Sequence, residues 1–214
     1  MRGGIVPSQI ATLTAYNPVH AIVPGMVGNE ARAADAELMR RVAAGDAAAC
    51  RFLVDRELPA IVAFAYRMLA SRSDAEDVGQ ECFLRLWKAS HKWRPDARVR
   101  TWLHRVARNL CIDRIRGRKP SDPIDTMELA ADGPGPSDAL QQTQVALLID
   151  EAVAGLPERQ RLAVALVHFQ EFSNIEAAKI MDVSVEALES LLARGRRALR
   201  GTLEGLRADL LGEP

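Results

Sequence analysis

The sequence predicts an all-α protein with two small helical domains joined by a flexible acidic linker, the C-terminal domain being a helix-turn-helix. Apolar residues recur every three or four positions through residues 30–119 and again through 139–210, the period of amphipathic helices. Between these segments, residues 120–138 are rich in proline and glycine, which interrupt helices. In the second segment, two capping patterns flank a short turn and precede a cluster of arginines, as in helix-turn-helix domains.

The composition excludes several functional classes. With 214 residues, 48% hydrophobic and 26% charged, the chain suits a soluble protein of one or two small domains. Three widely spaced cysteines without a CxxC pair indicate free thiols in the reducing cytoplasm, and the four histidines lack metal-ligand spacing, so we expect no metal or cofactor. No nucleophile–base arrangement or phosphate-binding loop indicates an enzyme. No run approaches the ~18 apolar residues of a membrane span, so direct membrane insertion is not expected.

Residues 1–29 are predicted to form a poorly ordered N-terminal extension. They contain three prolines and little periodicity, and they lack the continuous apolar core and cleavage site of a signal peptide. Met26 is an alternative first residue of the native chain, because the helical pattern begins shortly after it.

Residues 31–71 are predicted to form the first helices of the N-terminal domain, which extends over residues 30–119. Gly45 is placed to end one helix and Asp46 to cap the next. Pro59 is expected to start a new helix or to kink this one. The apolar face then continues through Ile61, Phe64, Ala65, Met68 and Leu69.

The next predicted helix has an acidic beginning. Ser73 and Glu76 match a capping box, and acidic residues in the first turn favour the helix dipole. Helical spacing predicts that one face is buried, with Val78, Cys82, Phe83, Leu86 and Trp87. The outward face then holds Asp77, Gln80, Glu81 and Arg85. The simple interpretation is a solvated face, and the alternative is a surface for a protein partner.

The helix that follows is basic and carries aromatic residues. Residues 85–119 contain twelve lysines and arginines against two acids, a net of +10 in a chain with no net charge. Such a concentration is typical of a surface that binds phosphates, and tryptophans beside it provide stacking surface for unpaired bases. Trp93 and Trp102 are those aromatics, although a core role for Trp102 is the simpler alternative. The predicted buried stripe is Val99, Leu103, Val106, Ala107 and Leu110, with Arg105, Arg108, Arg116 and Thr101 opposite and Trp102 and Asn109 between.

The linker at residues 120–138 is predicted from four prolines and two glycines. From residue 120 to residue 158 the chain has eight acids and no basic residue. It is either a solvated tether or a nucleic-acid mimic that lies in a basic channel of a larger partner.

The C-terminal domain is predicted over residues 139–210 and ends in a helix-turn-helix. One amphipathic helix ends near Leu156, and Pro157 begins the next. Ser173 and Glu176 form a second capping box, residues 182–184 form the turn, and Ser184 caps a last helix that runs to about Leu206. Its buried side is predicted to hold Leu188, Leu191, Leu192, Gly195, Ala198 and Leu199.

The outward face of this last helix is the predicted duplex-binding surface. The second helix of such a motif enters the major groove, so Glu186 and Ser190 near its start are the expected base contacts. Four arginines are expected to contact phosphates, namely Arg194, Arg196, Arg197 and Arg200. The alternative is an ordinary helical hairpin with a charged face.

Two segments together resemble a known family. DAEDVGQECFLRLWK followed by RVRTWLHRVARNLCIDRIR resembles the second domain of bacterial group IV, or extracytoplasmic-function (ECF), sigma factors of the sigma-70 family. LPERQR, the V-S-V turn and RGRRAL resemble the fourth domain of the same family. The resemblance covers about residues 30–118 and 139–207. One departure is Glu189 and Leu191, where many relatives carry lysine or arginine, so the promoter sequence cannot be deduced.

This resemblance implies a function and a role for each surface. Asp77, Gln80 and Glu81 would dock on the β′ clamp coiled coil of core RNA polymerase, and the β flap would be the other part of the polymerase that the protein contacts. Promoter DNA would be bound at two elements. Trp102, Arg105, Arg108, Asn109 and Arg116 would contact the −10 element, and Glu186, Ser190, Arg194, Arg196, Arg197 and Arg200 the −35 element. The linker would thread the polymerase active-site region, and an anti-sigma factor would hold the protein inactive until a stress or envelope signal.

Two alternatives from other classes are compatible with the residues. One is a helix-turn-helix repressor that acts without polymerase, although no additional helix for dimerisation is evident. The other is a helical adaptor that sequesters a regulator and has a merely solvated arginine face. Polymerase binding distinguishes the first from a sigma factor, and dependence on DNA distinguishes the second.

Overall fold

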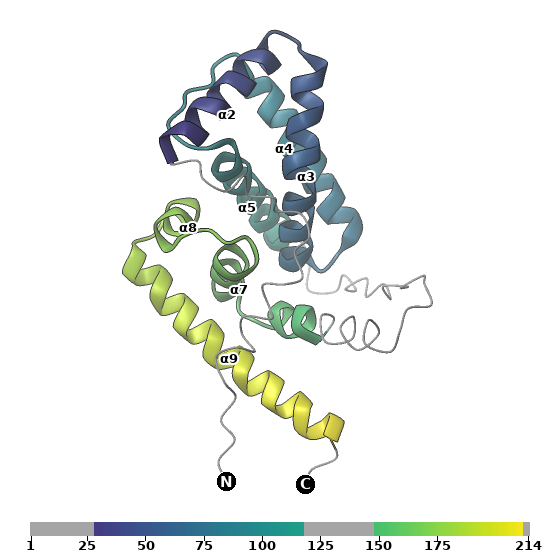
Figure 1. Cartoon of the computed structure of the whole chain (residues 1–214). Coiled ribbons are helices and arrows are strands. Elements are labelled where there is room, and N and C mark those ends of the chain that lie inside the picture. Colours follow the sequence, from purple (N-terminus) through teal and green to yellow (C-terminus); the bar gives the residue numbers. More distant parts are fainter. Residues whose placement is uncertain (1–27, 118–147, 212–214) are drawn as a thin grey trace. The chain divides into compact units, whose positions relative to one another are not determined.

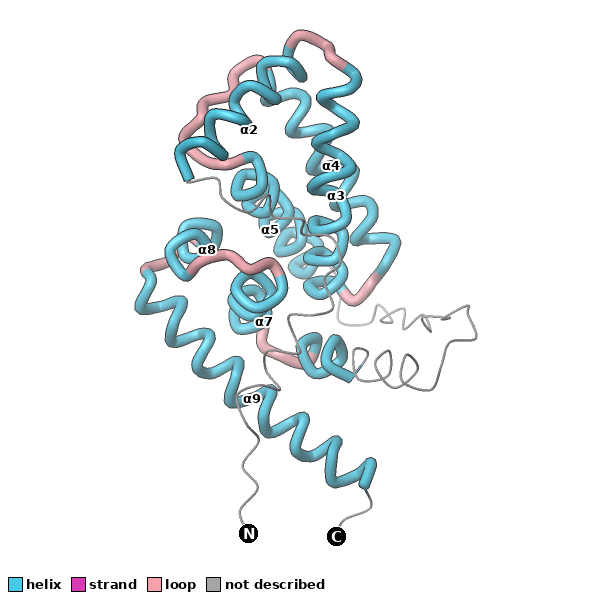
Figure 2. Tube along the Cα trace, viewed as in Figure 1, coloured by secondary structure: helices cyan, strands magenta, loops and turns pink. Residues whose placement is uncertain are grey.

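The computed structural model describes residues 28–117 and 148–211, and every regular element in these ranges is a helix (Figures 1 and 2). The described helices form two compact units, α2–α5 and the helices after residue 147. The predicted all-α class is thereby confirmed. The extension predicted over residues 1–29 lies outside the described residues except for Gly28 and Asn29, which are already helical, and the linker predicted at 120–138 lies outside them entirely.

The N-terminal unit contains four helices, α2 (Gly28–Ala43), α3 (Ala47–Leu69), α4 (Arg72–Ser90) and α5 (Val99–Gly117). Helix α3 is its centre, because α2, α4 and α5 all pack against it (Figure 1). The side chains that fill the space between them are fully buried, and the largest are Met39, Leu53, Ile61, Phe64, Met68, Leu69 and Leu103.

The helix boundaries follow local chemistry. Gly45 has a φ of +82°, a left-handed conformation that glycine adopts without strain, and it ends the α2 segment as predicted. Asp46 caps α3, since its carboxylate accepts hydrogen bonds from the backbone N–H groups of Ala48 and Ala49 at 2.8 and 3.1 Å.

Two predicted boundaries were wrong. The cap of α4 is Ser71, whose hydroxyl accepts from the Asp74 N–H at 3.3 Å, and not Ser73, which already lies in the helix. Ser71 can cap the helix because its backbone is extended, as a capping residue requires. Pro59 lies inside α3 and does not start a new helix, whereas a kink, the other expectation for this position, stays a prediction. It is exposed, and burial of the adjacent Ala60 and Ile61 carries the helix through that position.

The C-terminal unit begins with a helix at residues 148–154, followed by α7 (Glu158–Val164), the π-helical turn η2 (Ala165–Phe169), α8 (Asn174–Met181) and α9 (Val185–Leu211). The predicted capping box of α8 is present, with Ser173 and Glu176 bonded in both directions. Asp182 takes a left-handed conformation at φ 57° in the turn between α8 and α9. Helix α9 extends past the predicted end at Leu206 to Leu211.

Two features of this unit were not predicted. At η2 the Gln170 N–H donates to the Ala165 carbonyl at 3.0 Å, which is the five-residue spacing of a π-helix. Gly195 lets α9 approach α7 closely, because an added Cβ would lie 3.0 Å from Val164 Cγ2. The core of the unit is apolar and includes Leu162, Leu166, Ile180, Leu188 and Leu192.

The packing of α4 on α3 predicts that Gly79→Ala destabilises the N-terminal unit. An added Cβ would lie 2.8 Å from Leu58 Cδ1 and 2.9 Å from Val62 Cγ2. Overpacking of this kind costs ~1–3 kcal/mol, which exceeds the ~1 kcal/mol that alanine gains over glycine in a helix. We expect the free energy of unfolding to fall by about 1 kcal/mol in urea titrations followed by tryptophan fluorescence. All three tryptophans lie in this unit.

Gly117→Ala is the matched control, since an added Cβ at the end of α5 meets nothing within 4 Å. An equal loss of stability in both variants would contradict the steric explanation.

Candidate functional site

The outward strip of α4 holds the first group of predicted site residues. Asp77 and Gln80 are exposed and Glu81 is half-buried, while the opposite side of the helix packs Val78, Gly79, Cys82 and Phe83 into the core. The Glu81 carboxylate accepts a hydrogen bond from Arg85 Nε at 2.7 Å, which lowers its pKa. The strip is therefore polar and acidic at its N-terminal end, as predicted.

Apolar residues extend the same strip toward the end of α4, and this was not predicted. Trp87 was expected in the core, but its side chain is 44% exposed, and Leu84 beside it is 52% exposed. At ~100° per residue Trp87 lies about half a turn around the helix from buried Val78. The helical period therefore places Trp87 on the exposed side. The strip of Asp77, Gln80, Glu81, Leu84 and Trp87 is hereafter called the α4 strip.

The second group lies on α5, on one narrow side of the helix. Arg105, Asn109 and Arg116 are exposed, and Trp102 and Arg108 are half-buried at the margin. Arg108 Nη1 donates to Asn109 Oδ1 at 3.2 Å, which aligns two of the predicted residues. This outward side, with Trp102, Arg105, Arg108, Asn109 and Arg116, is hereafter called the α5 face.

An aromatic pair borders the α5 face. Trp93, in the segment between α4 and α5, contacts Trp102 edge to face with ring centroids 5.9 Å apart. Both side chains are half-buried, so Trp102 is neither a core residue nor fully exposed. The two rings thus form an apolar surface that lies next to the arginines of the α5 face.

The inner side of α5 is wider than predicted. Thr101, expected opposite the apolar stripe, is buried, and so is His104, for which no position was predicted. His104 Nδ1 donates to the Arg100 carbonyl at 2.9 Å, and its ring meets Phe64 edge to face. Satisfying the polar atoms of His104 within the helix and against an aromatic ring makes its burial possible. The helical period alone does not reveal this.

The C-terminal unit presents the third group on α9. The six predicted residues, Glu186, Ser190, Arg194, Arg196, Arg197 and Arg200, are all exposed. Ser184 caps the helix as predicted, with its hydroxyl accepting from the Ala187 N–H at 3.2 Å. A hydrogen bond from its own backbone N–H, and a second from Ser184, lower the pKa of Glu186. Ala198, predicted on the buried side, is exposed, whereas Gly195 one turn earlier packs against α7.

Glu189 is a further candidate site residue. The sequence had identified it only as a departure from the family pattern. It is exposed on α9 beside Ser190, and its carboxylate accepts from Asn174 Nδ2 of α8 at 3.3 Å. This bond fixes an acceptor between the two helices of the motif. Nothing in the sequence pairs two residues that far apart, because the pairing depends on the angle of the turn.

His168 in η2 lies close enough to Arg196 to feel its charge. Burial lowers the pKa of His168 in η2, and the charge of Arg196 lowers it further. His168 is therefore a neutral imidazole beside this arginine at neutral pH.

Two further observations bear on chemistry and location. Within residues 28–117 and 148–205, no group of three or more histidine, cysteine or acidic side chains is placed to hold a metal ion. Of the helices that the structure describes, none combines the length and the apolar character that crossing a membrane requires.

Comparison with known proteins identifies the family. The family model Sigma-70 region 2 matches residues 53–120, and Sigma-70, region 4 matches residues 146–199. The ECF RNA polymerase sigma factor SigW of Bacillus subtilis is 34% identical over 179 residues, covering 78% of this chain and 96% of that protein. The chain belongs to the ECF sigma factors. SigM of Mycobacterium tuberculosis is 31% identical over 174 residues, covering 80% of the chain and 86% of that protein.

A solved structure agrees with this assignment. CnrH, in complex with the cytosolic domain of CnrY, is 27% identical with a TM-score of 0.61, covering 80% of this chain and 98% of that one. A sigma factor binds core RNA polymerase and promoter DNA and directs transcription initiation, so this protein acts on DNA together with the polymerase and is not an enzyme. The repressor and adaptor alternatives are not favoured.

The buried thiols of this sigma factor lead to a prediction about reactivity. Burial raises the pKa of Cys82 and of Cys111 to about 12, whereas Cys50 is half-buried. Thiolates are the reactive form, so a disulfide reagent at pH 8 should modify Cys50 first and the other two only as the protein unfolds. Cys50→Ser should remove the fast phase, and rapid modification of all three thiols would contradict the predicted burial.

The same shifts have a consequence for alkaline stability. Above the ordinary thiol pKa of 9.0, an unfolded chain releases protons that the folded protein retains. The free energy of unfolding should therefore fall as the pH rises from 9 toward about 12.

Proposed function

We propose that this sigma factor uses the α4 strip to bind core RNA polymerase, the α5 face to bind the −10 element, and α9 to bind the −35 element. The observation that carries the proposal is the separation of charge between two adjacent helices. The α4 strip begins with acidic and amide groups, whereas α5 carries five arginines and one acidic residue. A protein partner and a nucleic acid therefore find different surfaces on one small unit.

Polymerase docking has a polar and an apolar part on α4. Asp77, Gln80 and Glu81 match the family's docking positions for the β′ clamp coiled coil. Leu84 and Trp87 extend this strip with the exposed apolar side chains that protein interfaces desolvate at their centres. We propose that Trp87 is an anchor of this interface, which explains why so large a side chain stays outside the core.

At the −10 element the protein has to hold DNA that is losing its duplex partner. Arginines 105, 108 and 116 supply phosphate contacts, and Asn109 beside Arg108 supplies donors and an acceptor for base edges. The Trp93–Trp102 pair supports stacking of an unpaired base, which does not depend on base identity. Charge and stacking together favour the opened strand over the duplex.

At the −35 element we propose that α9 enters the major groove of intact duplex. Glu186 and Ser190 contact base edges, and Arg194, Arg196, Arg197 and Arg200 contact phosphates. Glu189, oriented by Asn174, adds a third acceptor on this surface. Carboxylates at base edges accept from the amino group of cytosine, so cytosine is the base that this helix suits.

The two DNA-binding units act together because one chain carries both. Once one unit is bound to its element, the other is present at a high effective concentration, so neither has to bind tightly alone. We further propose that residues 120–138 connect them through the polymerase active-site region and that the C-terminal unit meets the β flap.

We also propose control by a dedicated anti-sigma factor, in a stress or envelope response. The similar protein CnrH was solved in complex with the cytosolic domain of CnrY, which supports the expectation that this chain also binds a second protein. The site of action is the cytoplasm, where RNA polymerase and the chromosome are found.

The docking role predicts that Asp77→Lys abolishes polymerase binding while the fold is retained. The substitution reverses the charge at an exposed position and buries nothing new. Reversing an interface charge of this kind weakens association by disfavouring encounter and by leaving its partner unpaired. The measurement is titration of labelled protein with core polymerase, followed by transcription from fragments of its own genome.

Asp55→Lys, at an exposed position on α3, is the control and should bind normally. Retained affinity in Asp77→Lys would exclude the docking role.

The phosphate role predicts that Arg197→Ala weakens promoter binding about equally on all sequences. Each phosphate contact releases a counterion, so the slope of log affinity against log salt should decrease in magnitude by about 1. The measurement is binding of the holoenzyme to a promoter fragment at several salt concentrations. Arg40→Ala on α2, where the side chain is 77% exposed, is the control and should leave the slope unchanged. An unchanged slope in Arg197→Ala would show that this residue touches no phosphate.

A further inference from the structure

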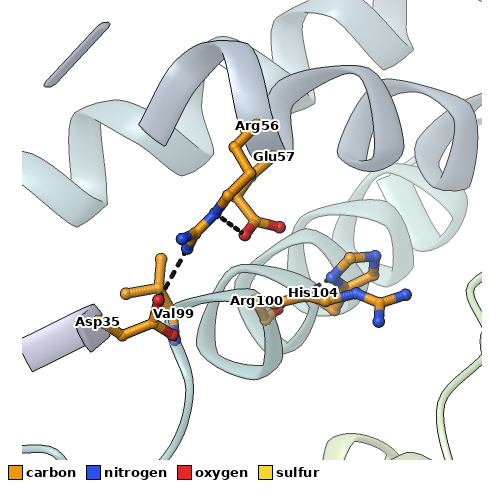
Figure 3. Close-up of polar contacts among 6 residues, drawn as sticks. All are labelled: Asp35, Arg56, Glu57, Val99, Arg100 and His104. Atoms are coloured by element: carbon orange, nitrogen blue, oxygen red, sulfur yellow. Dashed lines mark hydrogen bonds and ion pairs between the residues drawn. The ribbon is translucent and has the colours of Figure 1, made fainter. Parts of the chain in front are cut away.

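The first turn of α5 is held in place by a residue of α2. Asp35 lies 64 residues before Val99, yet its Oδ2 accepts a hydrogen bond from the Val99 backbone N–H at 2.9 Å (Figure 3). Val99 is the first residue of α5, where backbone N–H groups lack partners within the helix. Asp35 thus acts as the N-terminal cap of α5, although it comes from another helix.

The cap is buried and charged, which distinguishes it from an ordinary surface cap. Asp35 is only 3% exposed, and its Oδ1 accepts from Arg56 Nη2 of α3 at 2.8 Å. Arg56 Nε in turn donates to Glu57 Oε1 at 2.7 Å (Figure 3). One carboxylate therefore connects α2, α3 and α5 at a single point.

The balance of charge in this cluster depends on α5. Two buried carboxylates, Asp35 and Glu57, face one guanidinium, that of Arg56. The positive end of the α5 dipole, directed at Asp35, supplies the remaining compensation. Moving α5 away would leave a buried carboxylate partly uncompensated, and such groups are costly.

The inner side of α5 is fixed again within its second turn. His104 is fully buried, bonds the Arg100 carbonyl and contacts Phe64 of α3 edge to face. The outward side of the same turns carries Trp102 and Arg105, the first residues of the α5 face. The place of these two side chains is therefore set by contacts on the opposite side of the helix.

We propose that Asp35 is a positioning residue for promoter opening, which sets the place of the α5 face by capping α5 from α2. This inference rests on the proposed role of the α5 face at the −10 element. It also makes α2 part of the DNA-binding machinery, although α2 lies outside the residues that match Sigma-70 region 2.

The experiment measures promoter opening and polymerase affinity separately with the full chain. Holoenzyme is assembled on a promoter fragment that the wild-type protein transcribes, and opening is followed by a fluorescent base analogue within the −10 element. Asp35→Ala removes the acceptor, and Asp35→Asn keeps an oxygen for the Val99 N–H. Val99→Pro removes the donor at a helix position that tolerates proline, and it leaves Asp35 intact.

The matched control is Asp46→Ala. Asp46 caps α3 in the same unit by accepting from two backbone N–H groups, but it does not touch α5. It therefore reports the effect of losing a capping aspartate without moving the α5 face.

We expect Asp35→Ala and Val99→Pro to lower the rate of opening about tenfold, the order that loss of a strong cap produces, while affinity for core polymerase stays within about twofold. Asp35→Asn should recover part of the rate, because its amide oxygen can still accept from the Val99 N–H, whereas its NH2 group cannot accept from Arg56 Nη2. Asp46→Ala should open the promoter at the wild-type rate.

The proposal is overturned if Asp35→Ala and Val99→Pro open the promoter like Asp46→Ala, or if opening and polymerase affinity fall in the same proportion. If Asp35→Ala does not fold, Val99→Pro compared with Asp35→Asn decides between these outcomes. Arg105→Ala is measured in parallel, to separate the role of the α5 face at the −10 element from the role of Asp35. Normal opening in Arg105→Ala, together with a defect in the Asp35 variants, would overturn the role of the α5 face at this position and not that of Asp35.

Discussion

The burial of α4 and α5 against α3 is the constraint on which the function of the N-terminal unit depends. Each helix places one side in the core and leaves the other to solvent, so two surfaces of different chemistry can lie on one unit of about ninety residues. Gly79 allows α4 to approach α3 where a larger residue would overlap Leu58 and Val62. On α5, polar side chains also take part in the packing, because His104 and Thr101 are buried beside the apolar stripe. The packing therefore decides which side chains lie in the core and which are left on the α4 strip and the α5 face.

Much of this arrangement could be predicted from the sequence, because it follows from the period of the helix and from capping chemistry. Gly45, Asp46, Ser173 and Ser184 all act at helix ends as their residue types predict. The site residues on α4, α5 and α9 lie on the expected sides for the same reason. Trp87 was predicted wrongly because its large apolar side chain favours a core position, although its place in the helical period is on the surface. A residue that a partner will cover has the composition of a core residue and the spacing of a surface one.

The remaining features depend on tertiary structure and have no local signal. The bond from Asn174 to Glu189 and the cap of α5 by Asp35 both join residues from different helices. A sequence pattern identifies an aspartate in an amphipathic helix, but its partner is decided by the angle at which the helices cross. Pro59 illustrates the reverse case, in which a strong local signal is overruled by the burial of its neighbours. Positions of this kind require a structure.

The π-helical turn η2 has a consequence for how this chain tolerates change over evolutionary time. Its five residues place the Gln170 N–H on the Ala165 carbonyl, so the helix holds one more residue in that turn than an α-helix would. Fully buried Gln170 and the capping residue Ser173 follow directly. A bulge of this sort takes up a one-residue insertion where it occurs, and the segment beyond it keeps its register. The length of chain between α7 and α8 can therefore differ by one residue among descendants without rotating α9.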